Sequence, residues 1–157
     1  MISRQELTER YQQVKANVAE AAKRSGRRAE DVLVIAVTKY AAPDQIRQLV
    51  ELGHQDLGEN RVQQLQQRVA MVSEFIARHR QMPTPRSEHV PDEVRWHMIG
   101  HLQRNKVKPT LKLVKLIHSI DSLRVLEEVQ NQAQKQDIDV EVLIQVNASG
   151  EESKFGI

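Results

Sequence analysis

Lys39 is the residue whose position is best suited to covalent chemistry. It follows the six apolar residues at 32–37 closely, as the end of a buried strand would. Against an apolar wall, desolvation disfavours the charged form of a lysine and leaves more of its neutral, nucleophilic amine. Such an amine can form an imine with an aldehyde. The alternative is an ordinary solvated lysine at the end of a strand.

Asn60 is a second candidate, because it lies just after the short strand predicted at 56–57. An amide at that position can hold a ring substituent of a bound molecule by hydrogen bonding. It can equally cap the helix predicted to begin at Arg61. Both roles stay open, and one residue can fill both.

His97 and Ile99 fall on the same side of a predicted strand at 95–99. If that side faces a ligand, Ile99 can pack against a flat ring while His97 lies deeper; ordinary core packing is the alternative for His97. His97 and His101 are four residues apart, a spacing that aligns metal ligands on a helix. Because they sit at a strand-to-loop junction with no carboxylate motif alongside, we expect no metal site.

A basic stretch without an acidic residue lies at 104–115. It could contact phosphates and act as a nucleic-acid binding module. The chain has only one tryptophan, two tyrosines and two phenylalanines, so no platform for base stacking lies nearby. We therefore interpret the stretch as a solvated helix and expect no nucleic-acid partner.

The elements that would position these residues alternate regularly. An amphipathic helix is predicted up to Gly26, and Pro43 can open a second helix that Gly53 closes. A long polar helix is expected at 61–79, an exposed proline-containing insertion at 80–94, and a further helix after Asp121 or Ser122. Strands are predicted at 32–37, 56–57, 95–99, 116–120 and 140–146.

This alternation predicts an α/β fold with parallel strands joined by right-handed crossovers. No glycine-rich fingerprint follows the first strand at 38–43, which argues against a dinucleotide-binding sheet. In the strand at 140–146 one face is apolar, whereas the other ends in polar residues, as the lumen of a barrel does near its active mouth. We therefore expect part of a (β/α)8 barrel with about five strands, in which Lys39 lies at the functional end.

Five motifs occur in order along the chain. They are VIAVTK at 34–39, GENRVQ at 58–63, WHMIGHLQRNK at 96–106, HSID at 118–121 and SKFGI at 153–157. Together they resemble the pyridoxal phosphate homeostasis protein family, which are single-domain relatives of the alanine racemase barrel. The resemblance covers essentially all 157 residues.

The resemblance implies that Lys39 holds pyridoxal 5'-phosphate (PLP) as an aldimine. With Lys39 in that role, we expect Asn60, Ile99 and His97, by their positions on the predicted strands, to line the cofactor site. It leaves Lys154 either a secondary electrostatic role or none beyond that of a surface lysine. The implied function is PLP binding in homeostasis, with PLP-dependent apo-enzymes as recipients and no catalysis.

Two other hypotheses about the function remain. A racemase-like enzyme would need a second domain with a catalytic tyrosine, and the chain offers only Tyr11 and Tyr40. A truncated, non-binding relative is the other, because the phosphate-binding segments that the family carries after its sixth or seventh strand and near its end have no counterpart here. A complete barrel needs about 250 residues. We therefore expect a single incomplete domain over 1–157 that is marginally stable or aggregation-prone unless a partner completes the sheet, and a monomer if the barrel is complete.

Composition limits the remaining classes. Apolar residues make up 39% and charged residues 28%, as in globular proteins, and no run approaches the length of a membrane helix. The N-terminus lacks the apolar region of a secretory signal. Without cysteines, disulfides and thiolate chemistry are excluded, and a reducing compartment is favoured. A net charge of +2 indicates no polyanionic partner. We expect a cytoplasmic protein.

Overall fold

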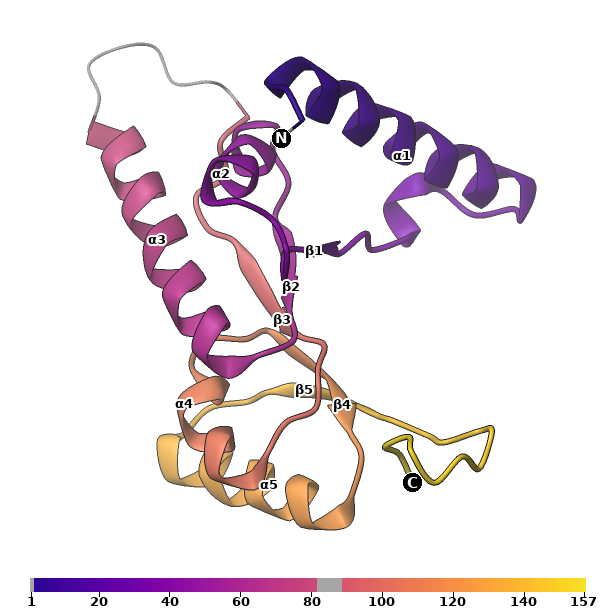
Figure 1. The fold of residues 1–157 in the computed structure, drawn as a ribbon, viewed down its shortest axis with the longest axis vertical. Helices are drawn as coiled ribbons and strands as arrows, with labels where there is room; N and C mark the ends of the chain where they lie inside the picture. Colours follow the sequence, from indigo (N-terminus) through magenta and orange to yellow (C-terminus); the bar gives the residue numbers. More distant parts are fainter. Residues whose placement is uncertain (1, 82–88) are drawn as a thin grey trace.

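The computed structural model describes residues 2–81 and 89–157 (Figure 1). An N-terminal helix precedes five strands that alternate with helices. The helices are α1 (Arg4–Arg24), α2 (Pro43–Glu51), α3 (Val62–Gln81), α4 (Val107–Leu111) and α5 (Leu123–Gln136), with 3-10 turns η1 (Ala29–Asp31) and η2 (Arg104–Lys106). The strands are β1 (Ala36–Val37), β2 (Asp56–Glu59), β3 (Arg95–Met98), β4 (Leu116–Ile120) and β5 (Glu141–Ile144).

All five strands are parallel and follow one another in the order β1-β2-β3-β4-β5. In the register of the sheet, Leu57 lies opposite both Ala36 and Trp96. A doubly wound sheet reverses its strand order at a switch point, whereas a barrel adds each strand beside the previous one. The unbroken order confirms the predicted α/β fold and its partial-barrel architecture.

The hydrophobic core lies between the sheet and the helices on one of its sides. Leu57, Met98 and Ile117 are fully buried there, together with Leu65 of α3 and Val129 of α5. In Figure 1, α3, α4 and α5 lie along this side of the sheet, while the other side is open between α1 and the C-terminal segment. The open side corresponds to the lumen of a barrel.

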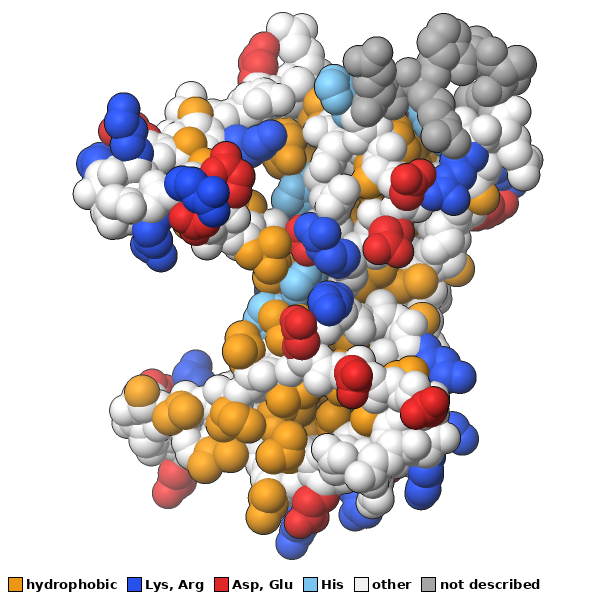
Figure 2. Space-filling model, turned by 180° about the vertical axis from the view of Figure 1, so that it is seen from behind, with side chains coloured by type: hydrophobic (Ala, Val, Ile, Leu, Met, Phe, Trp, Pro, Cys, Tyr) orange, Lys and Arg blue, Asp and Glu red, His pale blue; other side chains and the backbone are white. Residues whose placement is uncertain are grey.

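Figure 2 shows the open side as a hollow, with histidine side chains at its middle and apolar side chains gathered below them. Large apolar side chains exposed in the structure are Val14, Leu33, Val37, Tyr40, Leu123, Leu143, Ile144, Val146, Phe155 and Ile157. Of the apolar face predicted for the strand at 140–146, Val140 and Val142 contact the core, whereas Ile144 and Val146 are exposed.

Local sequence signals explain where the helices begin and end. The Ser3 side chain accepts a hydrogen bond from the backbone N–H of Glu6 and caps α1. Gly26, with a φ of 72°, follows its end in the left-handed conformation that glycine adopts without strain. Pro43 is the first residue of α2, where its fixed φ suits a helix and its missing N–H costs nothing.

Two predictions about loops and strands need revision. Of the apolar run at 32–37, only Ala36–Val37 pairs with a neighbour, and Leu33 is 55% exposed, so this strand is not buried on both faces. The reason is that helices pack on one side of the sheet only: Ala36 contacts the core, whereas Val37, opposite Gly58, lies on the open side and is exposed. Within the insertion predicted at 80–94, residues 82–88 lie outside the described residues; α3 continues to Gln81, and Pro91 is buried.

Candidate functional site

Lys39 occupies the tip of a turn that directly follows β1. The backbone N–H of Thr38 donates to the carbonyl of Gly58 at 3.0 Å and extends the pairing with β2 by one residue. The N–H of Ala41 then donates to the carbonyl of Thr38 at 2.9 Å and closes the turn over Lys39 and Tyr40. Lys39 is half-buried, and its Nζ lies 5.2 Å from the centroid of the Tyr40 ring. Lys39 thus lies at the carboxyl end of the sheet, as the sequence predicts.

Asn60 follows β2 at the same end of the sheet. Its Oδ1 is buried and has no hydrogen-bond partner among the described residues, so it does not cap α3. A buried acceptor of this kind costs free energy until it meets a donor. Its backbone lies against Gly100, where an added Cβ would come within 2.2 Å of the Asn60 carbonyl oxygen. Asn60 is therefore held close to the end of β3 with an amide oxygen free to accept.

An apolar surface lies on the open side beside these residues. Gly58 sits between Ile35 and Ile99, and a Cβ added to it would lie 3.0 Å from the Ile35 Cγ2 and 3.3 Å from the Ile99 Cδ1. Because Gly58 has no side chain, the surface of the sheet is recessed at this point, and Ile35 and Ile99 flank the recess. The surface has the character needed to pack against a flat ring.

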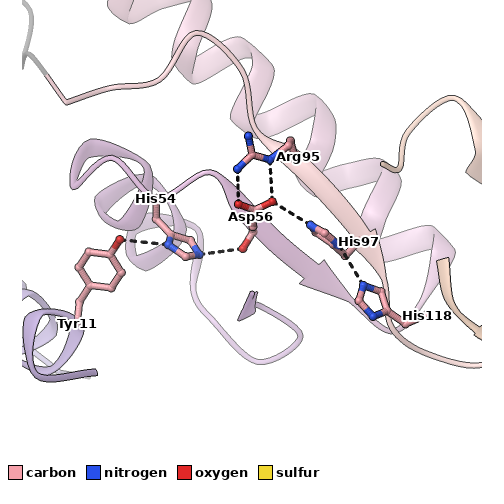
Figure 3. A network of polar contacts seen from close by, with 6 residues as sticks. All are labelled: Tyr11, His54, Asp56, Arg95, His97 and His118. Atoms are coloured by element: carbon pink, nitrogen blue, oxygen red, sulfur yellow. Dashed lines mark hydrogen bonds and ion pairs between the residues drawn. The ribbon is translucent and has the colours of Figure 1, made fainter. Parts of the chain in front are cut away.

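His97 shares the side of Ile99 but lies nearer the amino ends of the strands, within a network of six polar residues (Figure 3). Its Nε2 lies 3.0 Å from the Asp56 Oδ1, and its Nδ1 lies 3.0 Å from the Nε2 of His118. Asp56 also accepts two hydrogen bonds from Arg95, at 2.8 and 2.5 Å. Both ring nitrogens of His97 are engaged with protein groups, which favours the packing role over direct contact with a ligand.

The carboxylate of Asp56 fixes the direction of these hydrogen bonds. Because a carboxylate only accepts, Nε2–H of His97 donates to it, which leaves Nδ1 of His97 to accept from the Nε2–H of His118. Burial by itself raises the pKa of Asp56, but hydrogen bonds from Arg95 and His97 outweigh it, so the pKa lies below its ordinary value. Burial, followed by the influence of His97, lowers the pKa of His118.

The same network reaches the N-terminal helix. The Tyr11 hydroxyl lies 3.1 Å from Nδ1 of His54, whose Nε2 lies 2.8 Å from the carbonyl oxygen of Asp56. Since that carbonyl only accepts, Nε2–H of His54 donates to it and Nδ1 accepts from Tyr11. Burial raises the pKa of Tyr11 and lowers that of His54. These two hydrogen bonds connect α1 to the start of β2, at the end of the sheet opposite the one that carries Lys39.

A further cluster lies at the carboxyl ends of β3 and β4, and the sequence indicates none of it beyond the metal-ligand spacing of His97 and His101. Nδ1 of His101 lies 2.6 Å from Oδ2 of Asp121, and its ring stacks on Phe155 with centroids 4.2 Å apart. Lys154, beside Phe155, is exposed. The motifs containing these residues signalled the region, but their pairing depends on the fold.

The basic stretch forms η2 and α4 with its cations mainly outward. Arg104 contacts Glu128 at 3.2 Å, and Lys115 contacts Glu141 at 3.4 Å. Lys108 is exposed. Within residues 2–81 and 89–157, no three histidine or acidic side chains are grouped to hold a metal ion, and no helix is both long and apolar enough to cross a membrane.

Comparison with known proteins shows what the chain resembles, although no protein-family model matches it. It is 35% identical to the pyridoxal phosphate homeostasis protein of Aquifex aeolicus over 95% of this chain and 58% of that protein. It is 31% identical to the protein of the same name in Escherichia coli over 92% of this chain and 56% of that one.

Solved structures agree with these sequence matches. A protein of unknown function from Bifidobacterium adolescentis superposes with a TM-score of 0.81 and 31% identity, over 99% of this chain and 62% of that one. PipY of Synechococcus elongatus, in a structure with PLP bound, gives a TM-score of 0.65 and 26% identity, over 88% of this chain and 57% of that one. The chain is therefore a homologue of the pyridoxal phosphate homeostasis proteins and spans little more than half the length of these relatives.

Proposed function

We propose that this chain binds PLP and takes part in intracellular PLP homeostasis, with Lys39 as the residue that holds the cofactor. The observation that carries the proposal is the Lys39 amine at the carboxyl end of the sheet, where barrel proteins keep their chemistry. The names of the relatives and the PLP bound to PipY support it.

The residues around Lys39 fit the chemistry of PLP. The cofactor supplies an aldehyde, to which the lysine nitrogen adds while the carbonyl oxygen leaves as water. The free Oδ1 of Asn60 can accept a hydrogen bond from the ring hydroxyl. Ile99 and the side-chain-free surface at Gly58 offer apolar contact to the ring. His97 holds β3 to β2 through its hydrogen bond with Asp56.

Binding fits the described residues better than catalysis. A racemase needs a second acid–base group opposite the lysine. Tyr11 is bonded to His54 at the other end of the sheet, and Tyr40 is 90% exposed beside Lys39. The relatives are also named for homeostasis, not for a reaction. The proposal includes a cytoplasmic location, a single PLP-binding domain that is a monomer if its barrel is complete, and transfer of PLP to apo-enzymes.

The test is a PLP titration followed by the visible absorbance of the imine. Wild type and Lys135→Ala, which removes an exposed lysine of α5, should give the same saturable signal. Lys39→Ala should lose it. A Lys39→Ala variant that keeps the saturable signal would overturn the assignment. A folded wild type that gives none would favour the non-binding relative instead.

A further inference from the structure

The turn that carries Lys39 is held at both ends and free at its tip. Thr38, at its start, is 1% exposed, and Ala41, at its end, packs against the core. Between them, Tyr40 is 90% exposed. The backbone hydrogen bond from Ala41 to Thr38 closes the turn but does not by itself fix its direction relative to β2.

Glu59, the last residue of β2, holds the start of the turn from the helix side of the sheet. Its side chain is completely buried, and its Oε1 accepts a hydrogen bond of 2.5 Å from the Thr38 hydroxyl. Glu59 is also the residue directly before Asn60. One carboxylate therefore links the two backbone segments from which Lys39 and Asn60 extend.

Arg68 of α3 holds the end of the turn through the same carboxylate. Its Nε lies 2.8 Å from the Glu59 Oε1, and its Nη1 donates to the carbonyl oxygen of Ala41 at 3.2 Å. The planar guanidinium presents its donors in a fixed fork, so it keeps the distance between Glu59 and Ala41 constant. A lysine could supply the positive charge but could not reproduce the fixed pair of hydrogen bonds to Glu59 and to the Ala41 carbonyl.

We propose that Thr38, Glu59 and Arg68 form a clamp, here named the Lys39 clamp, that positions the Lys39 amine for reaction with the cofactor aldehyde. These are positioning residues: none extends into the open side, and each acts through the backbone of the turn. The inference rests on the proposed function and adds the device that orients its nucleophile. A buried ion pair contributes little net stability compared with apolar side chains of the same size. The more specific contribution of the Glu59–Arg68 pair is therefore that it contacts both the start and the end of the turn.

The experiment compares two reactions of Lys39 that differ in their demand for orientation. PLP must enter the site with its ring aligned, whereas formaldehyde with cyanoborohydride methylates any accessible lysine. Arg68→Met should slow imine formation with PLP about 10- to 100-fold, the range expected for a displacement near 1 Å. Methylation of Lys39, mapped by mass spectrometry without PLP, should stay within about twofold, because the tip of the turn remains accessible.

Three matched variants complete the design. Arg68→Lys should restore part of the rate of imine formation with PLP, because it keeps the charge opposite Glu59 but loses the hydrogen bond to the Ala41 carbonyl. Thr38→Val removes a single hydroxyl without changing the shape and should slow PLP about 2- to 10-fold, the worth of one hydrogen bond. Arg104→Met breaks an exposed ion pair with Glu128 and should change neither reaction.

A readout on the chain without PLP separates this inference from the proposed function. The Ala41 amide donates to Thr38, so hydrogen exchange at Ala41 should quicken in Arg68→Met while exchange in β4 stays unchanged. An unchanged PLP rate in folded Arg68→Met and Thr38→Val would overturn the clamp, and so would an equal loss of PLP reaction and methylation. If wild type forms no imine at Lys39, the proposed function fails, and unchanged exchange at Ala41 would then refute the clamp as well.

Discussion

Replacing Gly100 with alanine should displace Asn60 and weaken the site from the backbone. The new Cβ would lie 2.2 Å from the Asn60 carbonyl oxygen, 2.7 Å from its Cα and 2.8 Å from its carbonyl carbon. Ordinary contacts at a Cβ begin near 3.4 Å, so the two segments must separate by about 1 Å. Because the neighbours are backbone atoms and cannot rotate away, we expect a cost near the upper end of overpacking, about 2–3 kcal/mol.

The assay is urea unfolding combined with PLP titration. At a slope of about 1.5 kcal/mol per molar urea, this cost lowers the midpoint by about 1–2 M. The displaced amide should also weaken PLP binding about 2- to 10-fold, the worth of one hydrogen bond. Gly58→Ala is the matched control for the unfolding measurement alone, because Gly58 belongs to the proposed ring contact; its Cβ meets only methyl groups of Ile35 and Ile99 at 3.0–3.4 Å, and it should cost about 1 kcal/mol, the lower end of overpacking.

Equal midpoints for Gly100→Ala and wild type would refute the close approach of Asn60 to β3. A destabilised variant with unchanged PLP binding would be equally informative, because it would separate Asn60 from the cofactor site. Both substitutions reduce the freedom of the unfolded chain in the same way, so that contribution cancels in the comparison.

Two further predictions concern the network around Asp56. Burial lowers the pKa of His54 and His118 below their ordinary value of 6.5, so the unfolded chain binds more protons just below that pH. Stability should therefore be constant above about pH 7.5 and fall as the pH drops below 6.5, measured as urea midpoints between pH 8 and 5; a midpoint that rises on acidification would contradict the neutral histidines. Asp56→Ala leaves donors on Arg95 and His97 without their acceptor and should lower the free energy of unfolding by about 2–4 kcal/mol. The loss is no larger because Arg95 is partly exposed and can form hydrogen bonds with water instead. A loss below about 0.5 kcal/mol in urea unfolding would show that the carboxylate is not paired as described.

Much of the fold follows from hydrophobic patterning alone. Alternation of short apolar runs with amphipathic stretches predicts the parallel sheet, and the rule that barrel chemistry lies at the carboxyl ends of strands singles out Lys39. The prediction of burial on both faces for the apolar run at 32–37 is wrong, because helices cover one side of the sheet only and Val37 lies on the open side. Such exposure depends on what packs over each face of the sheet, and the sequence of a single strand does not encode it.

The polar contacts that shape the site could not be predicted in the same way. Arg68 lies in a helix that the sequence predicts as long and polar, and only the way in which α3 packs against β2 directs its side chain toward Glu59. His101 and Asp121 are 20 residues apart and meet because β3 and β4 end side by side. The free Oδ1 of Asn60 is likewise a property of the folded chain. These pairings depend on three-dimensional register, on which sequence spacing gives no information.

The most direct test of the account is borohydride reduction of the chain with near-stoichiometric PLP, followed by mass mapping of the modified lysines. We expect one adduct, on Lys39, which lies in the only turn joined to both Glu59 and Arg68 in the described part of the chain. Adducts scattered over many lysines, or none on a folded chain, would contradict it and would mean that this chain does not hold the cofactor through Lys39.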